Sequence, residues 1–224
     1  MLVTLLAAPA LATAHDLWVE RTPEGFLVRY GHRGGEVLDL DGAKVKAIRC
    51  GDGVSAPADV VTTARFAPKE VRFPGTCAVV SVFLDGGSWS LTPDGEVNRP
   101  RDQVRDVVRS WSSRQYAKWV DVHSPRAGAV LGDELELVPV TELARAHPGD
   151  KITLRVLSAG HPVANAVVAL DHRPLGETDS KGEVRVRLRT PGVESISTSV
   201  RRPGATPQAD AEVLEATLTF EVAR

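Results

Sequence analysis

The segment EVRVRLR, residues 183–189, decides the fold class of this chain. Its apolar residues Val184, Val186 and Leu188 alternate with charged residues. A period of two puts the apolar side chains on one face of a β-strand and the charged side chains on the other. The apolar face needs a second layer to cover it, so the segment predicts a strand of a layered β structure.

Strands of similar character surround this segment and predict a C-terminal β-sandwich domain over residues 125–224. They are ELELVPV (134–140), KITLRVLS (151–158), AVVALD (166–171), ESISTSVR (194–201) and ATLTFEVA (216–223). AHPGD, AGHPVAN, GETDSKGE and TPGV separate them and carry the Gly, Pro, Asn and Asp residues that favour turns. This spacing of turns is typical of an immunoglobulin-like or prealbumin-like module.

The first half of the chain predicts a second β module, over residues 15–98. Its strand candidates are FLVRYGH (26–32), KVKAIRC (44–50), VVTTARF (60–66) and CAVVSVFL (77–84), and its breaks are PEG, RGGE, DGA, GDG and DGGS. Residues 99–124 lack strong alternation, and we interpret them as a connector with a short helix around Arg101 to Arg109. The predicted fold is therefore all-β, with two β-sandwich-like modules joined by this connector.

Residues 1–14 predict a secretory signal peptide. Their apolar run is too short to cross a bilayer, and Ala12, Thr13 and Ala14 fit the small-x-small pattern of a signal peptidase site. No Lys or Arg precedes His15, so a buried first strand or an unstructured start is the alternative. Cleavage would place the protein in the periplasm and make His15 its first residue.

Charge distribution, motifs and apolar run lengths argue against nucleic-acid binding, common enzyme classes and a membrane span. The net charge is -2 with both signs mixed along the chain, whereas a nucleic-acid surface needs a basic stripe. The sequence has no hydrolase elbow, zinc-protease helix, phosphate loop or dinucleotide fingerprint, so we predict no enzymatic turnover. Beyond the first segment, no apolar run is long enough to span a membrane.

The two cysteines, Cys50 and Cys77, each lie where a strand meets a turn that contains Gly. An even pair in an exported protein favours a disulfide. A metal thiolate pair is the alternative, but the spacing matches no common zinc motif.

Several motifs together resemble a bacterial periplasmic family of largely unassigned function, whose members are often described as the periplasmic component of nickel or cobalt uptake systems. They are AHDLWVE (14–20), YGHRGGE (30–36), SSRQYAKWV (112–120), the stretch from Leu135 to Leu170, TDSKGEVRVRLRTPGV (178–193) and DAEVLEATLTFEV (210–222). The resemblance implies a bound divalent transition metal ion and a membrane metal importer as partner. The chain departs from the family pattern at ISTSVRRP (196–203), where members often have a histidine, and at Ala211 and Glu215, where they often have a tryptophan.

His15 is the first candidate metal ligand. A histidine at a free N-terminus offers its α-amino group and ring Nδ1 to one ion, and a second imidazole completes three nitrogens suited to copper or nickel. His32 is the candidate for that second ring. If Leu17 to Glu20 and Leu27 to Tyr30 form a hairpin that turns at RTPEGF, His15 and His32 meet at its open end.

Two further residues complete the predicted site. Asp16 offers a carboxylate as a ligand or as an acceptor that orients an imidazole, and His123 joins if the connector folds back. We interpret the remaining histidines as exposed turn residues: His147, His161 and His172.

Two other groups of side chains favour structural interpretations. We expect Trp18, Trp111 and Trp119 to pack in cores or between modules. The side chains of Arg114, Tyr116 and Lys118 either contact an anionic group or clamp the connector to a sandwich, and we favour the clamp.

The leading hypothesis is a periplasmic protein that captures nickel, cobalt or copper and delivers it to an importer. One alternative is a metal-free β-sandwich that binds envelope components. Another is an oxidative copper enzyme, since an N-terminal histidine with a second imidazole also serves such chemistry.

Overall fold

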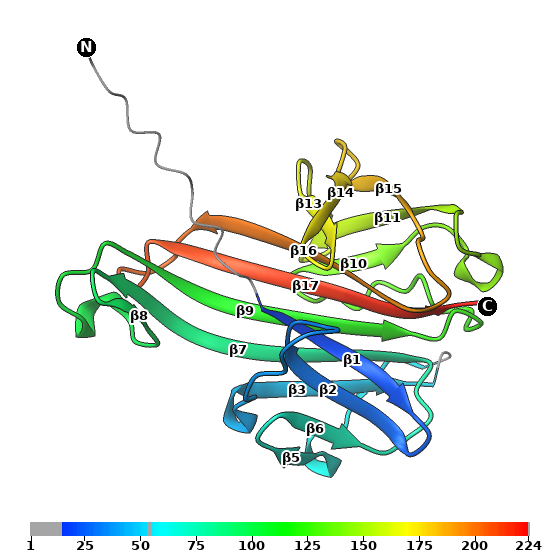
Figure 1. Cartoon of the computed structure of the whole chain (residues 1–224), viewed down its shortest axis with the longest axis horizontal. Helices are drawn as coiled ribbons and strands as arrows, with labels where there is room; N and C mark the ends of the chain where they lie inside the picture. The colour runs from blue at the N-terminus through cyan, green and yellow to red at the C-terminus, as the bar shows by residue number, and fades with distance from the viewer. Residues whose placement is uncertain (1–14, 53–54, 224) are drawn as a thin grey trace.

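A computed structural model describes residues 15–52 and 55–223 and confirms the all-β class (Figure 1). The helical elements within these residues are single turns of 3-10 helix, each three residues long. They are η1 (Gly42–Lys44), η2 (Val61–Thr63), η3 (Arg101–Gln103) and η4 (Leu143–Arg145). None of the described helices has the length and hydropathy that a membrane crossing requires. The predicted signal peptide lies outside the described residues.

The largest sheet contains strands from both halves of the sequence. Its order is β14 (Arg173–Glu177), β13 (Val167–Leu170), β16 (Gly192–Pro203), β17 (Ala211–Val222), β9 (Arg109–Val120), β7 (Val79–Thr92), β3 (Val45–Gly51) and β4 (Ala58–Asp59), with β8 (Gly95–Val97) paired to β7. All its pairs are antiparallel except that of β17 with β9, which is parallel.

Two four-stranded sheets lie on opposite sides of this large sheet (Figure 1). The N-terminal sheet has the order β1 (Asp16–Thr22), β2 (Gly25–Gly31), β6 (Glu70–Phe73) and β5 (Arg65–Ala67). The C-terminal sheet contains β10 (Glu136–Pro139), β11 (Lys151–Ser158), β12 (His161–Pro162) and β15 (Glu183–Arg187). The strand predicted from EVRVRLR is therefore present as β15, and its apolar residues Val184 and Val186 are buried.

The middle of the large sheet is buried on both faces. On β9, Tyr116 and Val120 pack in the core beneath the C-terminal sheet, whereas Ala117 and Trp119 pack in the core beneath the N-terminal sheet. Alternation along one strand thus divides its side chains between two hydrophobic cores. The buried Trp18 and Trp119 confirm the packing role expected for these rings.

The prediction of a connector over residues 99–124 is corrected by β9, which covers Arg109–Val120. The predicted helix around Arg101 to Arg109 is reduced to η3, three residues long. The sequence of β9 shows no apolar and polar alternation because its last six residues are all buried, on one face or the other. Likewise DGGS, predicted as a turn, lies inside β7, where Asp85 to Gly87 form a bulge.

Alternate polar side chains of β9 clamp it to the segment that leads into β10. Arg114 Nη1 and Tyr116 Oη donate to a Glu134 carboxylate oxygen over 2.7 and 3.0 Å. Lys118 Nζ donates to Glu136 Oε1 over 2.7 Å, and both side chains are almost fully buried. This contact confirms the clamp that we favoured over an anion site.

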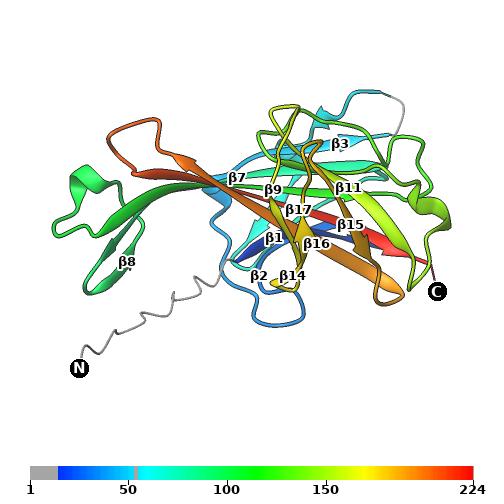
Figure 2. The ribbon, with the colours of Figure 1, turned by 90° about the horizontal axis from the view of Figure 1, so that it is seen from above.

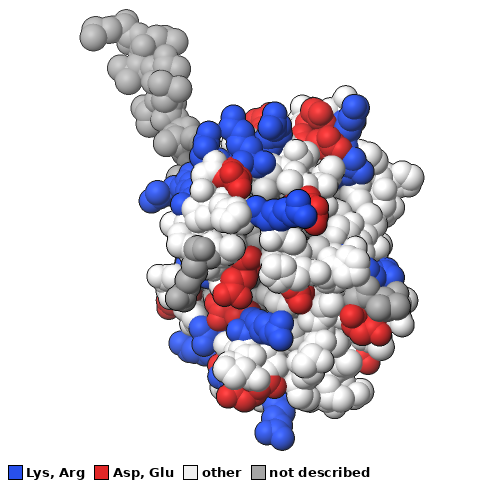
Figure 3. Space-filling model, turned by 90° about the vertical axis from the view of Figure 1, so that its right-hand side faces the viewer, with Lys and Arg blue, Asp and Glu red and all other residues white. Residues whose placement is uncertain are grey.

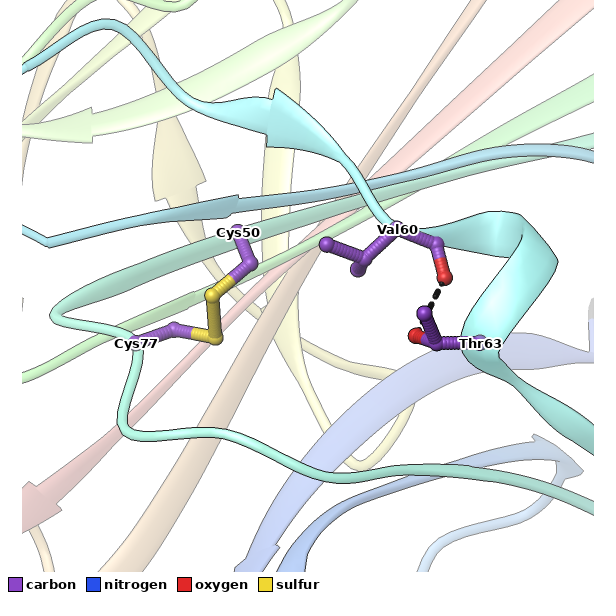
Figure 4. The surroundings of a disulfide bond; sticks show 4 residues. All are labelled: Cys50, Val60, Thr63 and Cys77. Carbon is purple, nitrogen blue, oxygen red and sulfur yellow. Dashed lines mark hydrogen bonds between the residues drawn. A yellow bond between two sulfur atoms is a disulfide. The ribbon is translucent and has the colours of Figure 1, made fainter.

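The predicted disulfide is present between Cys50, on β3, and Cys77, just before β7 (Figure 4). The Cα atoms are 5.3 Å apart, and 27 positions separate the two residues in sequence. Val60 and Thr63, joined by a hydrogen bond, are drawn beside it. The disulfide joins the point where the chain leaves the large sheet after β3 to the point where it returns at β7. The strands β5 and β6 lie between these two points, so the bond ties half of the N-terminal sheet to the large sheet.

The charged side chains on the face shown in Figure 3 are mixed in sign. Lys and Arg lie beside Asp and Glu, separated by uncharged surface, and the described part of this face has no continuous basic stripe. The expectation that the protein does not bind nucleic acid stays a prediction.

We predict that replacement of both cysteines, Cys50→Ala with Cys77→Ala, lowers the free energy of unfolding by about 3 kcal/mol. The unfolded chain then gains the entropy of an open loop. Urea unfolding of the oxidised protein and the variant measures the difference, and the unsubstituted protein treated with a reductant is the control that leaves every other atom in place. Equal midpoints for all three samples would contradict this role.

We predict that Lys118→Met lowers the free energy of unfolding by about 3–5 kcal/mol, because it leaves the Glu136 carboxylate buried without its cation. The matched control is Arg155→Met, which breaks the partly exposed pair with Glu183 and should cost less than about 1 kcal/mol. Chemical denaturation of the two variants compares them. A similar loss in both would show that burial does not govern these pairs.

Candidate functional site

The β1–β2 hairpin brings His15 and His32 together, as its predicted pairing requires. Seven residue pairs run from Asp16 opposite Gly31 to Thr22 opposite Gly25, where a two-residue turn closes the hairpin. His15 and His32 follow at the open end, with ring centroids 4.9 Å apart. The hairpin prediction is confirmed, while a metal role for the two rings stays a prediction.

His172 is a third ring at this place, although its sequence context had indicated only an exposed turn. It occupies the two-residue turn between β13 and β14 with Asp171, and both residues have positive φ, 48° and 59°. Such angles are those of a type I′ hairpin turn, which projects its side chains beyond the sheet. His172 Nε2 lies 2.9 Å from His32 Nδ1, and the two ring centroids are 4.9 Å apart.

Asp16 borders the same cluster. Its Oδ2 atom lies 3.8 Å from His172 Nε2, a distance longer than that of a direct hydrogen bond. Burial raises the pKa of the Asp16 carboxyl, and the histidines His172 and His32 act in the opposite direction. Asp16 is thus placed to orient the imidazole of His172 or to serve as an additional ligand.

His123, the remaining predicted ligand, does not join the cluster. It is exposed beyond the C-terminal end of β9, whereas His15 contacts Gln115 near the middle of that strand. The five residue steps from Gln115 to Val120 alone extend about 16 Å along a strand. His147 and His161 are exposed, as expected of turn residues.

Electrostatics keep His15 suited to bind a cation. Burial lowers the pKa of its imidazole, and the neighbouring His32 and His172 lower it further. A neutral imidazole keeps a lone pair for a metal ion. The ring of Tyr30 stands edge-on to His15, with centroids 5.6 Å apart.

The cluster does not by itself present a complete metal site. Within residues 15–52 and 55–223, no group of three or more His, Cys, Asp or Glu side chains has an arrangement ready to hold an ion. The residues that approach one another are nevertheless of the type that nickel, cobalt and copper prefer, namely imidazoles with a carboxylate beside them. Any ion bound here would need small side-chain movements or a further donor.

A cavity of about 1000 Å³ opens beside the cluster, and His15 and Tyr30 form part of its wall. Trp111, which had been expected to pack between modules, lines this cavity together with Trp89. Sequence reasoning gave no role to Trp89. The side of the sheet on which Trp89 lies depends on the bulge at Asp85–Gly87, which places Trp89 on the same side as Leu84. The sequence does not reveal this bulge.

Gln115 and Glu215 lie where the cavity meets the histidine cluster. Gln115 Nε2 donates to the His15 carbonyl oxygen over 3.2 Å and to Glu215 Oε2 over 2.7 Å. Burial raises the pKa of Glu215 to about 7, and the nearby Asp16 carboxylate adds to the rise. Gln115 could not be predicted from sequence because its partners, His15 and Glu215, are each 100 residues away in the chain.

Comparison with known proteins identifies a family but not an activity. No curated protein matches the chain. The family model described as a domain of unknown function, DUF4198, matches residues 12–202, which include the hairpin, the turn with His172 and most of the large sheet. The chain therefore belongs to the DUF4198 family.

Proposed function

We propose that this protein captures a divalent transition metal ion in the periplasm and delivers it to a membrane importer. The ion, nickel, cobalt or copper, would bind at the cluster of His15, His32 and His172. The observation that carries the proposal is the approach of His32 Nδ1 to His172 Nε2, 2.9 Å, beside a third imidazole.

The distance between these two nitrogens suits two ligands of one ion. Nitrogens that each lie about 2.0–2.1 Å from a metal and subtend a right angle are roughly 2.9 Å apart. Right angles occur in the square-planar and octahedral arrangements that Ni²⁺ and Cu²⁺ adopt. Without an ion, one ring donates a hydrogen bond to the other at the same distance. To bind a metal ion through both facing nitrogens, the donating ring would carry its proton on its other ring nitrogen.

Cleavage after Ala14 would add a fourth nitrogen. The α-amino group of His15 would then lie beside its own ring, and amines of this kind have a pKa near 7.7–8.0. The set would contain up to three imidazoles and one amine, with Asp16 next to them. This donor would be a backbone amine created by processing, in addition to the side-chain ligands.

Delivery requires that the ion can leave. The cluster lies at strand ends and in a turn, and the His172 side chain keeps 39% of its surface exposed. A site with few protein ligands and an open side exchanges its ion faster than a closed four-ligand structural site. This accessibility favours transfer to a partner over permanent storage.

We predict that His32→Ala and His172→Ala each weaken binding of Ni²⁺ or Cu²⁺ by about tenfold or more, because each removes a nitrogen ligand. Isothermal titration calorimetry on the processed protein measures the affinities. His161→Ala, on the exposed β12, is the matched control and should bind as the unsubstituted protein does. Unchanged affinity in both His32 and His172 variants would refute the site.

We predict that an extra Gly before His15 in the processed protein weakens metal binding about tenfold, because it moves the free amine away from the imidazole. The measurement is the same titration, with mass spectrometry to verify the first residue of each sample. Equal affinity in both forms would eliminate the terminal amine as a ligand while leaving the three rings to be judged by their own variants.

A further inference from the structure

The cavity beside the histidine cluster is formed where the large sheet extends beyond the N-terminal sheet. The strands β7, β9, β16 and β17 continue past β1 and β2 toward β8 (Figure 2). The uncovered part of their face and the segment around Leu38 to Lys44 line the cavity, which is open to solvent on one side. A space of about 1000 Å³ is at the upper end of the range for small-molecule sites.

One end of the cavity is aromatic. Trp89 and Trp111 face each other across β7 and β9, with ring centroids 6.4 Å apart and planes inclined by 9°. Lys44 Nζ lies 5.8 Å from the Trp89 ring and the Arg109 guanidinium 5.8 Å from the Trp111 ring. Since each indole already has a cation nearby, this end offers apolar contact to the body of a ligand rather than a site for another cation.

The other end presents hydrogen-bond acceptors. Gln115 is buried, and its Oε1 atom has no hydrogen-bond partner among the described residues. Glu215, which accepts from Gln115 Nε2, forms no ion pair within the described chain. Arg201 also lines the cavity, opposite Val213 on the neighbouring strand, but no ion pair joins it to Glu215. A buried acceptor without a donor is costly, so this end favours a group that donates.

We propose that the cavity binds a small organic amine with an aromatic or branched aliphatic body. The ammonium group donates to Gln115 Oε1 and Glu215, and the body packs against Trp89 and Trp111. This inference goes beyond the proposed function, because it needs no metal ion.

The positions of the two ends fix the size of the ligand. Trp111 and Gln115 lie four residues apart on the same face of β9, which corresponds to about 13 Å. A ring on Trp111 and an ammonium group near Gln115 therefore need a linker of several carbon atoms between them. A carboxylate in place of the ammonium group would face Glu215, so the site selects against organic acids at this end.

The test uses the whole processed protein, freed of metal with a chelator, and 4-phenylbutylamine as the probe. Calorimetry and tryptophan fluorescence measure its affinity against 4-phenylbutan-1-ol, 4-phenylbutanoate and benzylamine. We expect the long amine to bind at least about tenfold tighter than the alcohol and the short amine, and the acid to bind weakest. Equal or tighter binding of the alcohol or the acid, or no binding of any probe, would overturn the proposal.

Variants separate the two ends of the cavity. Trp111→Ala should weaken all four probes, whereas Glu215→Gln, which keeps the side-chain shape, should abolish only the preference for the amine over the alcohol. Val108→Ser, at an exposed position outside the cavity, is the control and should change neither. An amine preference that survives Glu215→Gln would refute the assigned orientation.

His32→Ala distinguishes this inference from the proposed function. Loss of metal binding with retained amine binding would show two separate sites, and failure of the metal proposal alone would leave the amine result unchanged. Amine binding that appears only after addition of a metal ion would contradict the inference as stated.

Discussion

The parallel pairing of β9 with β17 is the constraint on which the rest of the structure depends. Nine residue pairs, from Ala211 opposite Trp111 to Thr219 opposite Trp119, join the two halves of the sequence into one sheet. Because the middle of this sheet is buried on both faces, the N-terminal and C-terminal sheets must pack on opposite sides of it. Separation of the halves would expose both cores and break a backbone ladder, so each half depends on the other for burial.

The same pairing positions the histidine cluster. Two polar side chains on one face of the large sheet hold the first strand: Thr217 donates to the Leu17 carbonyl oxygen, and Gln115 donates to that of His15. The edge of this sheet carries the β13–β14 turn, which presents His172 to His32. Three imidazoles from distant parts of the sequence meet because one sheet supports both the hairpin and the turn.

Local features of this arrangement could be predicted from sequence, and contacts created by the tertiary fold could not. The hairpin register of β1 and β2 and the strand β15 follow from alternation and turn chemistry, which depend on residues close together in sequence. The disulfide follows because the chain has only two cysteines to pair. β9 was missed because a strand buried on both faces has no amphipathic period. His172 was missed because its partner His32 is 140 residues away in sequence, and no local pattern reports such a contact.

The two faces of β9 show how a structural polar group differs from one available to a ligand. Lys118, which faces the C-terminal sheet, donates to Glu136 and to the Ala129 carbonyl oxygen, and Glu136 also accepts from two backbone N–H groups. These buried charges are fully partnered, so they hold the fold and leave nothing for a further molecule. Gln115, on the opposite face, has a buried oxygen without a partner. Because an unpaired buried acceptor is costly, this oxygen is the group to which the proposed ligand, or a water molecule, would supply a donor.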